Sequence, residues 1–380
     1  MCRMRLPRVE DVEARLESRR GGARTASRVG LWLGAAFAIC FVTGVWSHLQ
    51  QDTPSWLAVP TSPASLYRVT QGLHVATGIA TVPLLIVKLW AVYPRLFRVP
   101  PRGGRPLLLH LLERGSIALL VASAIFMLVS GLLNVVQYYP WEFSFRRTHF
   151  AVAWIAIGSL LVHVAVKLPV IRDALSGPEP DDVDGPTRRQ VVGATLFASA
   201  AATVLSVGQS VTPLRRVSVL GVRDGEGPQD LPVNRTAREA GVTAAAVDEG
   251  WRLEVEFDGA VTTFSRADLL AMPQVTERLP IACVEGWSRS ADWTGVPVRA
   301  VLDAAGVPRR YPVRVESLQT RGAFAVTELP AHFADHRRTL LALALNGSTL
   351  AIDHGYPCRI IAPNRPGVLQ TKWVHRLVVR

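Results

Sequence analysis

Cysteine is scarce in this sequence, and its four copies are scattered along the chain. They stand at Cys2, Cys40, Cys283 and Cys358, without the spacing of a zinc site or a disulfide framework. Cys2 precedes every apolar run, so it does not match a lipoprotein cysteine. Each thiol is therefore interpreted singly, as a metal ligand, a nucleophile or, most commonly, a small buried hydrophobic side chain.

Lysine is scarcer still. Only Lys88, Lys167 and Lys372 occur, so the net charge of +12 is carried almost entirely by arginine. The arginines do not form a stripe interleaved with aromatic residues, which argues against nucleic-acid binding. Many of them stand beside apolar runs, a placement typical of membrane proteins. A lysine retained in such a chain indicates a position that favours a compact ammonium group.

Hydrophobic residues make up 49% of the chain and are concentrated in its N-terminal half. Runs of about 20 residues are long enough to cross a hydrocarbon layer of ~30 Å. We expect spans at residues 29–48, 71–92, 107–136 and 148–170, and a fifth, alanine-rich span at about 190–210. The expected domains are a cytoplasmic segment (1–28), a transmembrane domain (29–175), a linker with the fifth span (176–212) and a soluble domain (213–380).

Arginine placement predicts the orientation of these spans. The N-terminal segment and alternate loops are basic, with Arg95, Arg98, Arg102 and Arg105 after the second run and Lys167, Arg172, Arg188 and Arg189 after the fourth. Basic loops stay in the cytoplasm, so we expect the N-terminus inside and everything from about residue 211 outside. Arg188-Arg189 also resembles a twin-arginine export signal, and both interpretations give the same topology. The Pro- and Gly-containing stretch Gly177–Pro186 is the expected cytoplasmic linker.

Five histidines lie in or beside the spans, at His48, His74, His110, His149 and His163. Ionisable groups at membrane depth are costly, so they are functional candidates, although any one of them could be a hydrogen-bonded interfacial residue. His74 and His149 each open a span that runs inward. Two imidazoles from neighbouring helices suit the axial positions of a haem.

This arrangement resembles the four-helix di-haem cytochrome b subunits of formate dehydrogenases and hydrogenases. The resemblance implies a haem-binding helical bundle in which His74 and His149 hold an outer haem b. It also implies an inner haem held by His163, fourteen residues after His149 and on the same helix face. The inner end of the first span has no histidine, so His110 is the expected substitute. One haem or two remains open, and His48 is a third candidate at the outer site.

The soluble half predicts an α+β domain. Alternation in Trp251–Phe257 and the run Val313–Leu318 predict strands, and Ser265–Asp268 is a capping box that opens a short helix. We expect further helices at Val298–Ala305 and at Arg338–Leu345, the second followed by an Asn-Gly turn at 346–347.

Two segments of this half carry a family resemblance. The first reads Cys283-Val-Glu-Gly-Trp-Ser and continues to Trp293-Thr-Gly-Val-Pro297, and the second runs from His354 through Pro357-Cys-Arg359 to Lys372-Trp373. Together they resemble the molybdopterin-binding domain of the sulfite oxidase family over roughly residues 215–380. The resemblance implies that Cys283 supplies the one protein thiolate to molybdenum, and that a pterin dithiolene supplies two further sulfurs.

The same resemblance implies the remaining cofactor contacts. Arg359 and Lys372 suit the pterin phosphate, Gly355 and Gly367 allow close approach of the backbone, and His354 can hydrogen-bond the pterin. Asn234 and Arg235 occupy the place of an early pterin contact.

Other residues of the soluble half keep two interpretations. Arg289 either faces an anionic substrate or is a solvated loop arginine. Trp287 and Trp293 either line the site or pack in the core. His332 and His336 are more consistent with an exposed helix face than with a metal pair, and Cys358 with a buried small residue.

The sequence therefore predicts a membrane-bound molybdopterin-dependent oxidoreductase of the cytoplasmic membrane. It would transfer an oxygen atom to or from a small substrate such as sulfite or a sulfoxide, and exchange electrons with quinones through haem b. The alternatives are a membrane-anchored protein that binds a ligand without redox chemistry, and a thiol hydrolase that uses Cys283 with a histidine.

Overall fold

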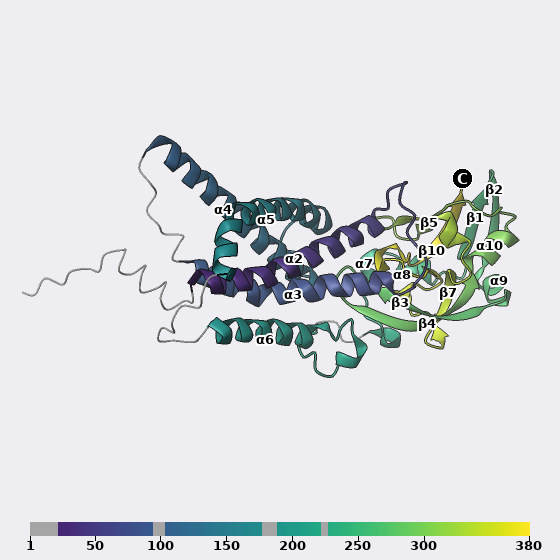
Figure 1. The fold of residues 1–380 in the computed structure, drawn as a ribbon. Coiled ribbons are helices and arrows are strands. Elements are labelled where there is room, and N and C mark those ends of the chain that lie inside the picture. Colours follow the sequence, from purple (N-terminus) through teal and green to yellow (C-terminus); the bar gives the residue numbers. More distant parts are fainter. Residues whose placement is uncertain (1–21, 94–102, 177–187, 222–226) are drawn as a thin grey trace, which may run out of the picture. The chain divides into compact units, whose positions relative to one another are not determined.

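The structure is a computed structural model that describes residues 22–93, 103–176, 188–221 and 227–380 (Figure 1). Arg95, Arg98 and Arg102, the linker Gly177–Pro186 and most of the N-terminal segment lie outside the described residues. The chain forms two compact units, each taken here by itself. Unit 1 comprises the chain up to Val45 together with Leu73–Ser206, and unit 2 comprises Trp46–Gly72 together with Val207–Arg380.

Unit 1 consists of helices, and five helices of the described chain are long and apolar enough to cross a membrane. The five predicted apolar runs are therefore helical, as expected. They are α2 (Gly22–Gln51), α3 (Leu66–Val92), α4 (Gly104–Val135), α5 (Phe145–Ser176) and α6 (Arg188–Val207). The last turns of α2 and the first turns of α3 belong to unit 2.

Polar side chains connect neighbouring helices of unit 1. Lys88 of α3 donates to the main-chain oxygen of Ala26 in α2 at 2.7 Å. Lys167 of α5 forms an ion pair with Glu113 of α4, and α4 packs against α5. The two lysines thus bond to neighbouring helices, because an ammonium group in an apolar layer needs an acceptor.

Unit 2 is built on two five-stranded sheets. Sheet A has the order β2-β1-β10-β5-β6, in which β1 pairs parallel with β10 and the other pairs are antiparallel. Sheet B has the order β3-β4-β7-β8, with β9 also paired to β7. The strands are β1 (Arg252–Phe257), β2 (Ala260–Ser265), β3 (Val275–Ala282), β4 (Ser288–Pro297), β5 (Val313–Ser317), β6 (Val326–Leu329), β7 (Leu340–Leu345), β8 (Ser348–Thr349), β9 (Arg359–Ile361) and β10 (Val374–Val379).

Short helices and turns connect these strands. The α-helices are α7 (Ala237–Ala240), α8 (Thr243–Ala246), α9 (Arg266–Ala271), α10 (Val298–Ala304) and α11 (Ala331–Ala334). The 3₁₀ turns are η2 (Thr212–Leu214), η3 (Pro228–Asp230), η4 (Ile352–His354) and η5 (Gly367–Leu369). The predicted capping box of α9 is confirmed, because Ser265 and Asp268 exchange both of its hydrogen bonds. The predicted strands at Trp251–Phe257 and Val313–Leu318 and the helix at Val298–Ala305 are also confirmed.

The predicted helix at Arg338–Leu345 is wrong, because this segment is strand β7. Its leucines and alanines favour helix locally, but β7 pairs with β4, β8 and β9. Leu341 and Leu343 face the core shared by the two sheets, whereas Leu340 and Leu345 face a second core on the other side of sheet B. A strand buried on both faces has no polar alternation, so its sequence resembles a buried helix.

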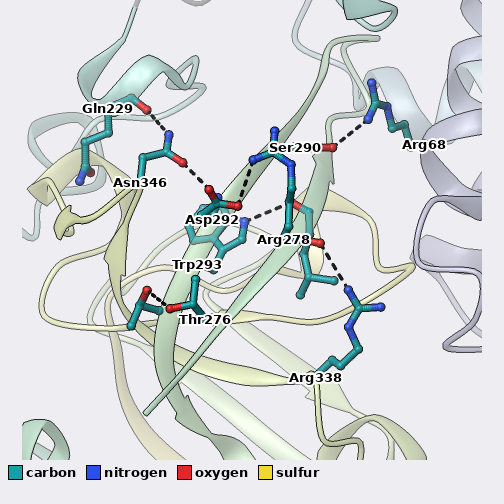
Figure 2. Close-up of polar contacts among 11 residues, drawn as sticks. Arg68, Gln229, Thr276, Arg278, Ser290, Asp292, Trp293, Arg338 and Asn346 are labelled. Carbon is teal, nitrogen blue, oxygen red and sulfur yellow. Dashed lines mark hydrogen bonds and ion pairs between the residues drawn. The ribbon is translucent and has the colours of Figure 1, made fainter.

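Polar contacts connect sheet B to the segment before it in the chain (Figure 2). Asn346, in the turn after β7, accepts from the Asp292 amide at 3.0 Å and donates to the main-chain oxygen of Gln229 at 2.9 Å. The Asp292 carboxylate pairs with Arg278 at 3.0 Å. These contacts fix β3, β4 and β7 beside the segment that leads to Asn234.

Candidate active site

Cys283 is the first residue after β3 and begins the tight loop that leads into β4. Its side chain is buried, with 2% of the residue exposed. Its amide donates to the main-chain oxygen of Trp287 at 2.9 Å, and its own main-chain oxygen accepts from the Gly286 amide at 3.1 Å. The loop therefore closes on itself and holds the sulfur in a defined place.

Asn234 reaches this sulfur from the segment before α7. Its Nδ2 donates to Cys283 Sγ at 2.6 Å, and its Oδ1 accepts from the indole of Trp287 at 2.9 Å. The Glu285 amide lies 3.4 Å from the same sulfur. Donors directed at sulfur suit a thiolate ligand, which is charged and accepts hydrogen bonds. Trp287 thus contributes to the site through Asn234.

Lys372 contacts the residue that follows Asn234. Its ammonium group donates to the main-chain oxygens of Arg235 at 2.6 Å and Asp353 at 2.8 Å. Asn234 and Arg235 are consecutive, so two neighbouring residues link the sulfur of Cys283 to a buried ammonium group. The structure brings these predicted site residues together.

Arg359 is the second buried cation of the region. Its guanidinium donates to the main-chain oxygens of His354 at 3.1 Å and Gln370 at 2.9 Å, and it lies 5.0 Å from the centre of the Trp293 ring. Its Nε is buried without a hydrogen-bond partner within the described residues. Trp293 is fully buried and donates to the Leu279 main-chain oxygen, so it has a packing role (Figure 2).

The electrostatics of this region favour an anion. Burial, and then the neighbouring Arg359, lower the pKa of Lys372 to about 7. Burial lowers the pKa of Arg359 to about 9. Two buried cations whose charged forms are disfavoured would both be stabilised by a negative ligand such as a phosphate.

His354 is held in one orientation beside these cations. Its Nε2 lies 2.6 Å from the main-chain oxygen of Pro228, and burial lowers its pKa to about 4. The ring is therefore neutral near pH 7, with Nε2 as the donor and Nδ1 left as the acceptor. His354 can accept a hydrogen bond from a ligand N–H group through Nδ1.

Two glycines allow the backbone to pass close to the site. Gly355 has a φ of 112°, which other residues rarely adopt, and an added Cβ would lie 3.1 Å from the Cβ atoms of Arg359 and Lys372. At Gly367 an added Cβ would lie 2.8 Å from the main-chain oxygen of Ala282, the residue before Cys283.

The residues present fit a molybdopterin cofactor. A buried thiol with a donor at its sulfur provides one soft metal ligand, and the orphaned Nε of Arg359 with the Lys372 ammonium group provides an anion site. Among the described residues, no cluster of three or more His, Cys, Asp or Glu side chains could hold a metal ion.

Arg289 is the second residue of β4, directly after the Cys283 loop. It is buried, and its guanidinium donates to the main-chain oxygens of Gln209 at 2.7 Å and Ser288 at 3.1 Å. The interpretation of Arg289 as a solvated loop arginine is therefore wrong. Its described contacts anchor the loop after Cys283, and a role toward substrate stays a prediction.

Four residues that hold this loop carry no signal in the sequence. Gln71 donates to the main-chain oxygen of Val284 at 3.3 Å, and Ser210 donates to that of Gly286 at 2.5 Å. The Gln209 main-chain oxygen accepts from Arg289, and Arg68 donates to the Ser210 main-chain oxygen at 2.9 Å. Arg68 also donates to Ser290 at 2.9 Å (Figure 2). Single polar residues near the ends of apolar runs carry no motif, so only their position three residues or fewer from a predicted span could have drawn attention to them.

The remaining predicted residues of unit 2 have plain structural positions. Cys358 is fully buried, as predicted, and burial raises the pKa of its thiol. His332 is exposed and its Nε2 lies 2.8 Å from the main-chain oxygen of Val59. His336 is half-buried and accepts from the Arg338 amide through Nδ1.

In unit 1, His74 of α3 and His149 of α5 lie together, with ring centres 6.4 Å apart and planes at 77°. Nδ1 of His74 lies 2.8 Å from the Cys40 main-chain oxygen, and Nδ1 of His149 lies 3.0 Å from Ser130 Oγ. Both Nε2 atoms are thus left for a ligand. Metal–imidazole bonds are about 2 Å long, so two rings at this distance leave room for one iron between them.

Two helix glycines lie against these rings. An added Cβ at Gly44 would lie 2.8 Å from the His74 ring, and one at Gly131 would lie 3.7 Å from the His149 ring. The geometry of the pair fits axial ligation of one haem. His163 and His110 make no ring contact with another histidine within the described residues, so their role as inner haem ligands stays a prediction, as does a role for His48.

Comparison with known proteins identifies the class of the C-terminal region. Residues 240–380 match the family model of the oxidoreductase molybdopterin binding domain. This part of the chain is therefore a molybdopterin-binding oxidoreductase domain, and the enzyme class predicted from the sequence is confirmed. The match does not extend to the helices of unit 1, so a cytochrome b domain rests on the histidine geometry alone.

Individual proteins are similar to parts of this chain. The chain is 30% identical over 112 residues to the putative protein-methionine-sulfoxide reductase subunit YedZ1 of Azospira oryzae, covering 30% of this chain and 42% of that protein. It is 32% identical over 145 residues to the protein-methionine-sulfoxide reductase catalytic subunit MsrP of Gluconobacter oxydans, covering 33% and 46%. It is 32% identical over 95 residues to a nitrate reductase of Phytophthora infestans, covering 24% and 10%. The chain thus spans less than half of each of these relatives.

Proposed function

We propose that this chain is a membrane-bound molybdopterin-dependent oxidoreductase that reduces a sulfoxide and receives its electrons through haem b from membrane quinol. One observation carries the proposal. The buried thiol of Cys283 lies inside a molybdopterin-binding oxidoreductase domain, and the Asn234 amide donates to its sulfur. The next residue, Arg235, accepts from the buried ammonium group of Lys372.

Each site residue has a distinct part in this proposal. Cys283 would hold molybdenum, with Asn234 fixing its sulfur, and Lys372 and Arg359 would bind the pterin phosphate. His354, neutral near pH 7, would accept a hydrogen bond from the pterin through Nδ1. Gly355, which has no side chain, would let the backbone approach the pterin closely. When bound, the cofactor supplies two-electron oxygen-atom transfer, and the protein supplies placement and charge.

The substrate class follows from the relatives. Two of them are named for methionine sulfoxide reduction, so a sulfoxide is favoured over sulfite. Reduction of a sulfoxide to a sulfide and water consumes two electrons and two protons. Arg289 is a candidate for the substrate side of the site, although its described contacts are to main-chain oxygens.

The electron path would enter through unit 1. His74 and His149 would hold one haem b through their Nε2 atoms, since both Nδ1 atoms already have hydrogen-bond partners. Arginine-rich loops on alternate sides of the spans favour a cytoplasmic N-terminus and an extracytoplasmic catalytic domain.

The molybdenum assignment is tested by Cys283→Ser. We expect sulfoxide reduction by the purified full chain, with reduced viologen as donor, to fall by more than about a hundred-fold, because a hydroxyl cannot replace the thiolate ligand. The haem absorbance should be unchanged. The control is Cys358→Ser, which alters an equally buried thiol outside the site. Retained activity in Cys283→Ser would sink the assignment.

The haem assignment is tested by His74→Ala and His149→Ala. Each should remove the haem absorbance band, because each takes away one of the two axial ligands. His336→Ala, in unit 2, should leave the band intact. A normal spectrum in either membrane variant would rule out the pair as ligands.

The metal and haem content of the purified protein distinguishes the proposed function from the alternative of a ligand-binding protein without redox chemistry. Molybdenum and haem analysis of the purified full chain should find both groups. A preparation that contains neither would favour the alternative.

A further inference from the structure

The two paired histidines of unit 1 are each bonded to the helix that precedes their own. His74 of α3 contacts the Cys40 main-chain oxygen in α2. His149 of α5 contacts the Ser130 hydroxyl in α4. We propose that Ser130 is a positioning residue that holds His149 for iron and lowers the midpoint potential of the haem. This inference rests on the proposed function, because it takes the two histidines as the axial ligands of one haem b.

The Ser130 hydroxyl fixes which nitrogen of His149 carries the proton. It donates its single hydrogen to the Met127 main-chain oxygen at 3.3 Å. The same hydroxyl oxygen lies 3.0 Å from Nδ1 of His149, where it can only accept. Nδ1 therefore carries the imidazole proton, and Nε2 keeps the lone pair that a metal requires. Ser130 is 1% exposed, so water has little access to compete for this contact.

His74 reaches the same tautomer through a different partner. A main-chain oxygen can only accept, so Nδ1 of His74, which lies 2.8 Å from the Cys40 oxygen, must be the donor. The Thr43 hydroxyl and the Cys40 thiol both lie farther from this nitrogen, at 3.5 Å. The Thr43 hydroxyl donates to the Ile39 main-chain oxygen at 2.7 Å. The backbone, and not a side chain, therefore holds this histidine.

A small polar residue followed by a glycine lies against each ring. The pair Thr43–Gly44 of α2 lies against His74, where a Cβ added to the glycine would be 2.8 Å from the ring. The pair Ser130–Gly131 of α4 lies against His149, where the same addition would be 3.7 Å from the ring. The two positions are thus matched in sequence and surroundings. They differ in that only Ser130 places its hydroxyl at normal hydrogen-bond distance from the ring nitrogen.

This hydrogen bond has a defined effect on a bound iron. An acceptor at Nδ1 makes an imidazole a more basic ligand through Nε2. A more basic ligand stabilises ferric over ferrous iron, so it lowers the midpoint potential of a haem. Removal of the Ser130 hydroxyl takes the acceptor away from one of the two ligands, and the potential should rise. A lower potential makes a haem a stronger reductant, which suits a centre that passes electrons on to a substrate site.

Redox titration of the purified full chain, followed at the haem absorbance, tests this role. Ser130→Ala should retain haem and raise its midpoint potential by about 59 mV, the equivalent of a loss of about ten-fold in ferric over ferrous binding. Ser130→Thr keeps a hydroxyl and should return the potential to that of the unmodified chain. Thr43→Val is the matched control. It should shift the potential much less, because the Cys40 main-chain oxygen remains.

The inference is overturned if Ser130→Ala leaves the midpoint potential unchanged, or if Thr43→Val shifts it as far. Should Ser130→Ala lose its haem, Ser130→Thr decides the question. A haem at the unmodified potential in Ser130→Thr supports the role of the hydroxyl. Loss of haem in Ser130→Thr as well would show that packing at this position matters and the hydroxyl does not.

The same preparations separate this inference from the proposed function. If His149→Ala removes the haem but Ser130→Ala keeps the unmodified potential, the role of Ser130 fails alone. If Ser130→Ala shifts the potential but reduced viologen supports no sulfoxide reduction, the proposed activity fails alone. An unmodified chain purified without haem would contradict the haem part of the proposed function, and the role of Ser130 with it.

Discussion

At the residue scale, the candidate site contains two cations, Lys372 and Arg359, that are buried in the absence of a bound anion. Lys372 satisfies its donors with two main-chain oxygens, and Arg359 does the same. Burial disfavours the charged form of both groups and lowers their pKa values, and the main-chain oxygens satisfy hydrogen bonds without neutralising the charge. A phosphate would supply the missing negative charge.

Retention of the cofactor should accordingly depend on pH. In the cofactor-free protein the pKa of Lys372 is about 7, and a bound phosphate would raise it. Above pH 7, Lys372 must therefore take up a proton when the cofactor phosphate binds. The affinity for the cofactor should be greatest below pH 7 and fall by up to about ten-fold per pH unit between pH 7 and pH 9. Molybdenum and pterin retained after dialysis at several pH values would measure this.

Lys372→Met provides the control for this pH dependence. The variant should bind the cofactor more weakly, with a flatter profile between pH 7 and pH 9. A steep profile that survives in Lys372→Met would assign the effect to another group.

At the scale of the element, turn η5 matters most for the site. Gly367 lies against the end of β3. A Cβ added at Gly367 would lie only 2.8 Å from the Ala282 main-chain oxygen. Ala282 is buried, and the buried residues Pro366 and Gln370 flank η5, so neither backbone can shift cheaply.

Gly367→Ala should therefore displace the strand end that carries Cys283. We expect unfolding by denaturant to show a loss of about 1–3 kcal/mol from overpacking, together with loss of molybdenum. Val368→Ala, in the same turn, changes a side chain and leaves the backbone contact intact. Equal stability and molybdenum content in the two variants would contradict this role of Gly367.

The elements also show what the sequence could predict. Capping residues, alternation and apolar runs identified α9, β1, β5 and the five long helices, because each pattern reflects a local physical need. Strand β7 was missed because burial on both faces removes alternation, although the Asn346-Gly347 turn after it, with φ of 48° and 79°, is typical of a hairpin.

The candidate site was predictable for a different reason. Motifs drew attention to Cys283, Lys372 and His354, and the structure brings them together. The supporting contacts of Gln71 and Ser210 were not predictable, because they depend on which main-chain oxygens the fold places nearby.

At the scale of the whole molecule, topology is the property most open to a direct test. Five spans and the arginine distribution predict opposite sides for the end of α5 and for the segment after α6. Ser176 and Val219 are exposed residues at these two places.

Cysteine labelling can read this topology. In a Cys2→Ser background, a membrane-impermeant maleimide should label Val219→Cys in intact cells and label Ser176→Cys only after permeabilisation. The native Cys283 and Cys358 are buried and should react little. Labelling in the reverse order would invert the proposed orientation.

The loop after Cys283 has a consequence for how this enzyme can be divided. Its main-chain oxygens are held by Gln71 and Ser210, and Arg289 is anchored on Gln209. All of these partners precede residue 213, where the soluble domain would be cut by composition. A fragment cut there would keep the matched domain but lose the residues that hold the loop after Cys283. A shortened chain that keeps this loop in place would have to retain Trp46–Gly72 and residues 207–212, which belong to the same compact unit.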